Sequence, residues 1–154
     1  MNRIQGMPTE TADHKRIIIL SLQPEPYEMI LQGIKKHEFR RKFPVVPVNA
    51  FIYVSSPVKA IQGYIEFGEP IVDEVERLGL IAEEEGSGTV SGISSYMKGL
   101  KKGFAIPIRS IREIEPLPLE ELKQKYLFAA PQLYITADSK PELKKELLRR
   151  LRNS

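Results

Sequence analysis

The chain has 154 residues, of which 42% are hydrophobic and 28% are charged, and its formal net charge at pH 7 is +3. This size and composition predict one globular domain with its own hydrophobic core. The absence of cysteine excludes disulfides and a cysteine nucleophile, two histidines argue against a histidine-rich metal site, and no apolar run approaches the ~20 residues of a membrane span. The polar start of the chain lacks the apolar stretch of a signal peptide, so we expect a cytoplasmic protein that needs no metal or other cofactor.

The sequence divides into three parts by its periodicity. Residues 1–15 mix glycine, proline and threonine without an apolar period, so we expect a flexible N-terminal arm. Residues 16–136 alternate short apolar runs with turn residues, which indicates the folded domain. Residues 137–154 contain leucines spaced three and four apart among lysines and arginines, which predicts a basic amphipathic C-terminal helix.

Four strands and one helix are predicted in the first half of the domain. Apolar, β-branched runs indicate the strands, and Pro24 and Pro26 favour the start of a helix because proline fits the first turn. The helix is expected to end before Gly33, since glycine suits a left-handed C-cap. The expected strands are Arg16–Leu22, Lys36–Lys42, Ala50–Ser56 and Ala60–Gly68, the last with Ile61, Gly63, Ile65 and Phe67 on one face.

The second half predicts more helix and one further strand. Segment Glu84–Ser95 is rich in glycine and serine, so we expect it to be mobile or functional. Near the C-terminus, Ser139 and Glu142 have the spacing of a capping box. Helices are expected at Ile71–Leu80, Ser94–Leu100 and Leu119–Tyr126, and a strand at Phe104–Ile108, where Pro107 favours an edge or a bulge. These elements indicate the α+β class, with a small curled sheet or barrel and helices packed against it.

Charge is distributed unevenly along the chain. Eight carboxylates lie between Glu66 and Glu85, which makes this stretch acidic. One short segment is basic and contains a single acid, Glu38, among Lys35, Lys36, Arg40, Arg41 and Lys42. This asymmetry predicts a molecule with an acidic side and a basic side, and the basic side would attract phosphate.

The segment from Gly33 to Arg40 resembles the signature of the ASCH domain family, which has the pattern G-x-K-x-x-E-x-R. All four fixed positions match, as Gly33, Lys35, Glu38 and Arg40, and the wider resemblance extends over about Arg16–Tyr134. The resemblance implies a PUA-like mixed β-barrel with flanking helices and a cleft between barrel and helices that contains the motif. It also implies an RNA-binding or nucleotide-binding role, for example in a regulator of transcription or translation.

The residues themselves suggest how such a cleft would bind RNA. On a strand, Glu38 and Arg40 share one face, where they can pair with each other or hydrogen-bond to a base edge, while Phe39 faces the core. Lys35 follows the helix cap, where its ammonium would meet a phosphate. The remaining candidate ligand residues lie in the basic segment or in stretches that resemble the family: Arg41, Lys42, Ser55, Ser56, Lys101, Lys102 and Gln132.

Simpler interpretations of these residues stay open. Gly33 is expected to be a structural cap rather than a ligand contact. Glu38 and Arg40 can form a plain surface ion pair, an interaction that contributes little to stability. Tyr53 and Tyr64 are expected to pack in the core rather than to stack on bases.

An enzymatic role is the main alternative. Some ASCH proteins hydrolyse acetylated cytidine and resemble G-x-K-x-x-T-x-R at the motif, with the lysine, the threonine and a separate glutamate as catalytic groups; others are proposed to cut RNA. Here Glu38 stands at the threonine position, so a catalytic hydroxyl is missing. Lys35 and Glu38 can still form an acid–base pair for another substrate, such as RNA. A regulator that binds a small ligand or a protein is a third interpretation.

Overall fold

The structure is a computed structural model that describes residues 16–154, so the expected arm at residues 1–15 lies outside the described residues. In chain order the elements are β1 (Arg16–Leu22), α2 (Pro24–Leu31), β2 (His37–Arg40), β3 (Val48–Val54), β4 (Ala60–Phe67), β5 (Ile71–Glu74), α3 (Val75–Glu85), α4 (Val90–Tyr96), β6 (Lys102–Pro118), α5 (Leu119–Tyr126), β7 (Tyr134–Thr136), a 3-10 turn η1 (Ala137–Ser139) and α6 (Pro141–Arg152). In residues 16–154, no helix has both the length and the apolar character needed to span a membrane.

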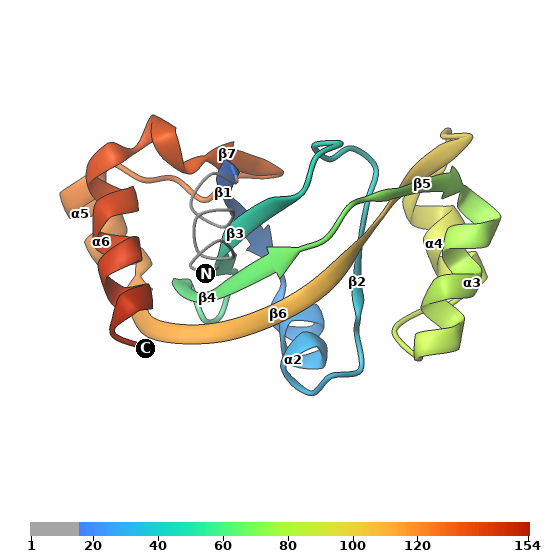
Figure 1. Ribbon diagram of the computed structural model, residues 1–154, viewed down its shortest axis with the longest axis horizontal. Helices are drawn as coiled ribbons and strands as arrows, with labels where there is room; N and C mark the ends of the chain where they lie inside the picture. The colour runs from blue at the N-terminus through green and yellow to red at the C-terminus, as the bar shows by residue number, and fades with distance from the viewer. Residues whose placement is uncertain (1–15) are drawn as a thin grey trace, which may run out of the picture.

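The strands form one mixed, curled sheet. Their order is β2-β6-β4-β3-β1-β7, and β5 pairs with the edge of β6 opposite to β2. β1 and β3 are parallel because α2 and β2 connect them, and the other strand pairs of the described chain are antiparallel. Figure 1 shows β6 as one long strand that crosses the molecule. Its first part pairs with β2 and β5, and the rest pairs with β4. The α+β class with a barrel-like sheet and flanking helices is therefore confirmed.

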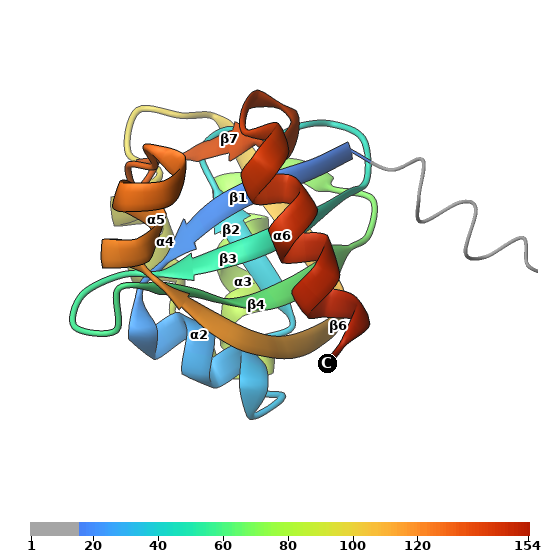
Figure 2. The same ribbon diagram turned by 90° about the vertical axis from the view of Figure 1, so that its left-hand side faces the viewer.

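The two faces of the central strands pack into two different hydrophobic clusters. Leu20 and Ile52 face the interior of the curl together with Tyr27 of α2. Ile19 and Phe51 face the opposite side, where α5 and α6 cover the sheet. Figure 2 shows α6 lying across β1, β3 and β4 on that side. The near-continuous burial of β1 and β3 thus follows from helices or strands packed on both of their faces.

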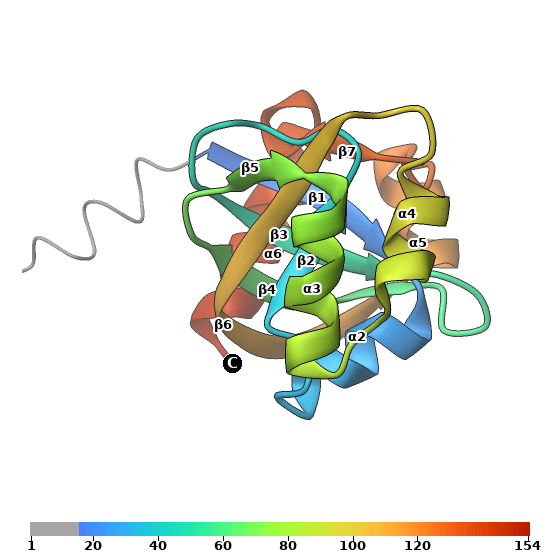
Figure 3. The same cartoon turned by 90° about the vertical axis from the view of Figure 1, so that its right-hand side faces the viewer.

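A third, smaller cluster holds the α3–α4 helical pair against β2 and β6. Phe39 and Ala105 of the sheet pack there against Leu78, Ala82 and Met97. Figure 3 shows α3 and α4 beside each other on this side of the molecule, with α3 over β2 and β6. The expectation that Phe39 is buried is confirmed, but its cluster is this one and not the interior of the curl.

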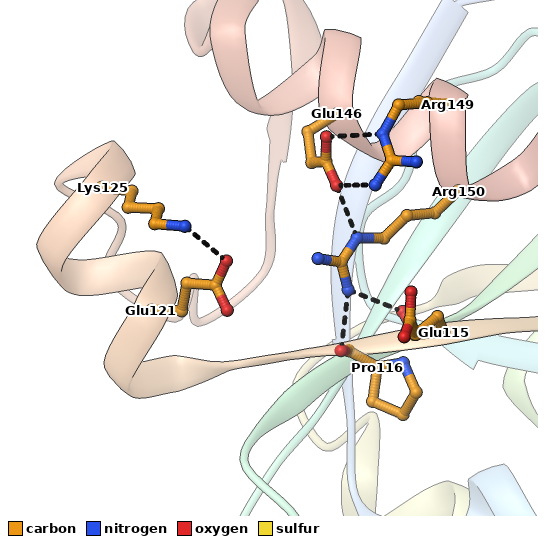
Figure 4. Close-up of polar contacts among 7 residues, drawn as sticks. All are labelled: Glu115, Pro116, Glu121, Lys125, Glu146, Arg149 and Arg150. Atoms are coloured by element: carbon orange, nitrogen blue, oxygen red, sulfur yellow. Dashed lines mark hydrogen bonds and ion pairs between the residues drawn. The ribbon is translucent and has the colours of Figure 1, made fainter.

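Polar contacts as well as leucines attach α6 to the rest of the fold. Leu143 and Leu147 are fully buried in the second cluster. The Arg150 guanidinium donates to the backbone carbonyls of Glu115 and Pro116 at 3.2 and 2.8 Å, so it attaches the helix to the end of β6 (Figure 4). The amphipathic helix predicted from the leucine spacing is therefore present and docked.

Glu146 lies between two arginines of α6. Its carboxylate accepts hydrogen bonds from Arg149 and Arg150, with Nη2 and Nε respectively 2.7 Å from Oε2. These hydrogen bonds lower the pKa of Glu146 from 4.5 to about 2. Glu146 is consequently ionised throughout the neutral range and neutralises part of the basic face of the helix.

Some of the expected elements were wrong. The predicted helix at Ile71–Leu80 begins with the strand β5, because its first residues pair with β6, and becomes helical only at Val75. The segment expected to be mobile or functional, Glu84–Ser95, is largely helical, because it contains the end of α3 and most of α4. The predicted capping box does not form: Ser139 lies in η1, where its hydroxyl donates to the carbonyl of Thr136.

Ile61 was expected on the same face of β4 as Gly63, Ile65 and Phe67, and this expectation is wrong. The pairing with β3 passes from Gly63–Ile52 to Ile61–Tyr53, so Gln62 is an extra residue in a bulge. Ile61 therefore faces the second cluster, whereas Ile65 faces the first. The left-handed cap expected at Gly33 is confirmed by a φ of +80°.

Candidate functional site

A pocket of about 470 Å³ lies between the sheet, the start of α2 and the α3–α4 pair. This volume is within the range of small-ligand sites, roughly 300–1,000 Å³. The residues that line the pocket come from well-separated parts of the sequence: Ser21, Leu22, Gln23, Pro26, Lys35, Glu38, Phe39, Arg40, Ser55, Ala82, Ser87, Ile93, Tyr96 and Gln132.

The strand β2 provides the charged part of this lining. Glu38 and Arg40 alternate with His37, Phe39 and Arg41, as expected for side chains that point to opposite faces of a strand. The even positions face β1 and the pocket, where Arg40 donates to the carbonyl of Ser21 in β1 at 2.9 Å. The odd positions contact the α3–α4 pair: His37 Nδ1 is 2.9 Å from a carboxylate oxygen of Glu85 in α3.

Three charged side chains of the motif form one connected group in the pocket. Arg40 Nε donates to Glu38 Oε2 at 2.7 Å, and Lys35 Nζ lies 3.6 Å from Glu38 Oε1. All three are buried, with exposed fractions of 9% for Lys35, 6% for Glu38 and 9% for Arg40. The simple surface ion pair considered from the sequence is thus replaced by a buried triad.

The triad has one uncompensated positive charge, from two cations and one carboxylate. Among residues 16–154, no other charged side chain lines the pocket. The charged side chains of the lining therefore sum to one positive charge, which would attract an anion without displacing either protein partner of Glu38.

Lys35 is placed by the end of α2. Gly33 ends the helix in a left-handed conformation, and the amide of Lys35 then donates to the carbonyl of Met29 at 3.1 Å. Its ammonium lies 4.8 Å from the centre of the Phe39 ring and has no hydrogen-bond acceptor within the described residues. A buried ammonium with donors still available suits a ligand oxygen.

Neutral polar groups come from two loops. Ser55 directly follows β3 at the start of the β3–β4 turn, where its amide donates to the carbonyl of Leu22 at 2.9 Å. Gln132 lies in the segment before β7, and the neighbouring carbonyl of Pro131 accepts a hydrogen bond of 2.7 Å from the Ser21 hydroxyl. Both loops are thereby attached to β1 beside the triad.

The structure brings together five of the ten predicted ligand residues and leaves five outside the pocket lining. Arg41 uses its guanidinium on the backbone carbonyls of Tyr96 and Lys98, at 3.0 Å each. The others lie outside the lining with exposed side chains: Lys42, Ser56, Lys101 and Lys102.

The sequence interpretation missed the wall of the pocket that α4 forms. Ile93 and Tyr96 are one helical turn apart and both line the pocket. Ile93 lies within the glycine- and serine-rich segment and Tyr96 comes directly after it, where an isolated tyrosine gives no periodic signal. By contrast, Tyr53 and Tyr64 are buried at 3% and 7% exposure, which confirms that they pack in the core.

The pocket can bind a ligand that has both a negative charge and hydrogen-bonding groups. Two cations, a carboxylate, hydroxyls and the amides of two glutamines line it beside apolar surface from α4 and Phe39. In the described part of the chain, no group of three or more histidine, aspartate or glutamate side chains is placed to hold a metal ion.

Comparisons with known proteins identify the family of this chain. The chain is 31% identical over 127 residues to an ASCH domain-containing ribonuclease of Zymomonas mobilis, an alignment that covers 80% of this chain and 85% of the relative. No protein-family model matches the chain. On the sequence relationship, the protein belongs to the ASCH domain family.

Solved structures share the fold. The crystal structure of ASCH from Zymomonas mobilis superposes with a TM-score of 0.75 at 26% identity, over 87% of this chain and 94% of that one. A serine-to-alanine variant of the Zymomonas mobilis protein superposes with a TM-score of 0.72 at 26% identity, over 88% of this chain and 96% of that one. The similarity therefore spans nearly the whole of both chains.

Proposed function

We propose that this protein binds single-stranded RNA, with one nucleotide in the pocket and its phosphate on Lys35 and Arg40. The observation that supports this most strongly is the buried triad with one excess positive charge. Among phosphate-containing ligands we favour RNA, because the relative is a ribonuclease. A pocket of about 470 Å³ suits one unstacked nucleotide rather than a duplex, and unpaired nucleotides are the usual targets of sequence-specific RNA-binding proteins.

In this proposal Glu38 orients the two cations and also contacts the ligand. Its carboxylate keeps Arg40 in place through the Nε hydrogen bond, while other guanidinium N–H groups remain available to a phosphate oxygen. Ser55 and Gln132 provide donors and acceptors for the sugar or the base edge. Binding without cleavage would suit a regulator of transcription or translation.

The test is a titration of fluorescently labelled, single-stranded RNA at two salt concentrations. Wild-type affinity should fall with salt, and Lys35→Ala should weaken binding and lower the salt slope by about 0.7, the value for one lost phosphate contact on a single strand. Lys123→Ala removes the same charge from the exposed face of α5 and should change neither quantity. Equal affinities for all three proteins would refute the proposal.

Cleavage of RNA is the second candidate, because the relative is a ribonuclease. Glu38 would accept the proton of the ribose 2′-hydroxyl as that oxygen bonds to the adjacent phosphorus. The bond from phosphorus to the 5′-oxygen breaks, and Lys35 would give that oxygen a proton. The products are a 2′,3′-cyclic phosphate and a 5′-hydroxyl, with Arg40 stabilising the extra charge on the phosphate.

Cleavage can be tested with the same RNA. Wild type, Lys35→Ala and Lys123→Ala are purified in parallel so that a contaminating nuclease would appear in all three. Products from wild type and Lys123→Ala but not from Lys35→Ala would establish catalysis at this site. N4-acetylcytidine serves as the substrate for the amidohydrolase alternative, which we expect to fail because Glu38 replaces the catalytic threonine.

A further inference from the structure

Tyr96 is an exposed aromatic residue at the edge of the pocket. It is 47% exposed, although most other aromatic side chains in the described residues pack in a cluster. Neither a hydrogen bond of its hydroxyl nor a ring contact with another aromatic residue occurs within residues 16–154. Its ring is therefore free to contact a ligand.

The backbone of Tyr96 is fixed more firmly than its exposure suggests. Arg41 at the end of β2 donates from Nη1 to the carbonyls of Tyr96 and Lys98, at 3.0 Å each. One residue further on, Met97 is fully buried in the third cluster. The last turn of α4 is thus attached to the same strand that presents Glu38 and Arg40 to the pocket.

The side chains of α4 complement the charged triad. Ile93 and Tyr96 lie one helical turn apart and line the same pocket as Lys35 and Arg40. A nucleotide likewise has a charged part and an apolar part, since its phosphate is charged while its base has an apolar, polarisable face. Stacking of bases on aromatic rings tolerates every base and is a common means of binding single strands.

We infer that Tyr96 is the base-stacking residue of the pocket and that Arg41 is a positioning residue that holds it against the nucleotide. The inference rests on the proposed RNA binding and accounts for the base of the nucleotide, whereas the triad accounts only for its phosphate. It also assigns a role to Arg41 that differs from the direct ligand contact expected from the sequence.

Variants at position 96 separate stacking from charge. Tyr96→Ala should weaken binding of a short, labelled RNA by about five-fold or more, the usual loss when one stacked base loses its aromatic partner. Tyr96→Phe keeps the ring and should bind as wild type does. The salt slope should be the same in all three proteins, because the phosphate contacts stay intact.

A fluorescent base gives a readout that a purely structural role would not change. An RNA with one 2-aminopurine should lose fluorescence on binding to wild type and to Tyr96→Phe, because a stacked 2-aminopurine is quenched, but not on binding to Tyr96→Ala. Arg41→Gln should reduce both affinity and quenching, with the extent of folding checked by circular dichroism. If Arg41→Gln does not fold, the three proteins that differ at position 96 still test whether Tyr96 stacks on a base.

The outcomes of these experiments distinguish RNA binding by the pocket from base stacking on Tyr96. No RNA binding by wild type refutes the proposed function. Binding by wild type with equal affinity and quenching for Tyr96→Ala refutes the stacking role alone and leaves the triad as the RNA site. An abasic RNA bound by wild type as tightly as the intact RNA would overturn the inference in the same way.

Discussion

Replacing Glu38 by glutamine tests whether the buried triad is both a structural element and an anion site. The substitution keeps the shape of the side chain but removes the one negative charge between Lys35 and Arg40. Loss of one partner of a fully buried ion pair costs about 3–5 kcal/mol. Because this triad borders a pocket that water and ions can enter, we expect about 2 kcal/mol, or a Tm about 4–8 °C lower for a domain of this size.

Anions should reverse part of this loss. Inorganic phosphate that occupies the pocket would replace the missing carboxylate, so it should raise the Tm of Glu38→Gln more than that of wild type. A ligand at ten times its Kd stabilises by about 1.4 kcal/mol, which is a measurable share of the deficit. Thermal melts followed by circular dichroism, with and without phosphate, provide the measurement.

Glu121→Gln is the matched control for this experiment. Its carboxylate pairs with Lys125 at 3.1 Å on the surface of α5 (Figure 4), where such pairs contribute less than about 1 kcal/mol. The control should melt close to wild type and respond equally to phosphate. If Glu38→Gln melts like the control and gains no more stability from phosphate than wild type does, the carboxylate does not stabilise the fold and phosphate does not replace it.

Three further predictions concern stability. Phe39→Ala should lower the free energy of unfolding by about 3 kcal/mol, because it removes a buried ring from the third cluster; a loss below 1 kcal/mol in urea would contradict that packing. Gly63→Ala should cost about 1–3 kcal/mol because the new Cβ would lie 2.6 Å from the Tyr27 hydroxyl, whereas Gly88→Ala, with 3.5 Å to its nearest neighbour, should be close to neutral in the same urea titrations. Glu146→Gln should lower the free energy of unfolding by about 1 kcal/mol at pH 7. Because the pKa of Glu146 is lowered in the folded protein, this difference is present above pH 4.5 and should vanish as the pH falls toward 2. A difference that stays constant across this pH range would show that the ion pairs of Glu146 are not its source.

Local sequence patterns predicted the elements whose own residues contain a clear periodic or apolar signal. Strand Arg16–Leu22 and helix Leu119–Tyr126 have the bounds expected from their patterns, because one contains an apolar, β-branched run and the other has a regular helical period. Strand β5 was missed since Ile71, Val75 and Leu78 fit a helical spacing. Its extended form depends on hydrogen bonds to β6, a partner some 30 residues away that no local pattern indicates.

The site was predictable where it coincides with the motif and unpredictable where it depends on tertiary contacts. Lys35, Glu38 and Arg40 were expected together from their spacing, and they form the triad. The pocket wall formed by Tyr96 arises from the docking of α4, which the sequence did not indicate. Arg41 was expected to meet a ligand, yet it donates to backbone carbonyls at the end of α4, an arrangement that only the packing of α4 on β2 determines.

The most direct test of the central claim is an NMR titration of the isotope-labelled protein with a short single-stranded RNA. Binding in the pocket predicts that the largest amide shifts fall on β2 around Glu38 and Arg40, on Tyr96 and on the loops of Ser55 and Gln132, with saturation at one RNA per chain. Shifts confined to the basic face of α6, with the pocket residues unchanged, would contradict the account and place the nucleic acid on the opposite side of the sheet.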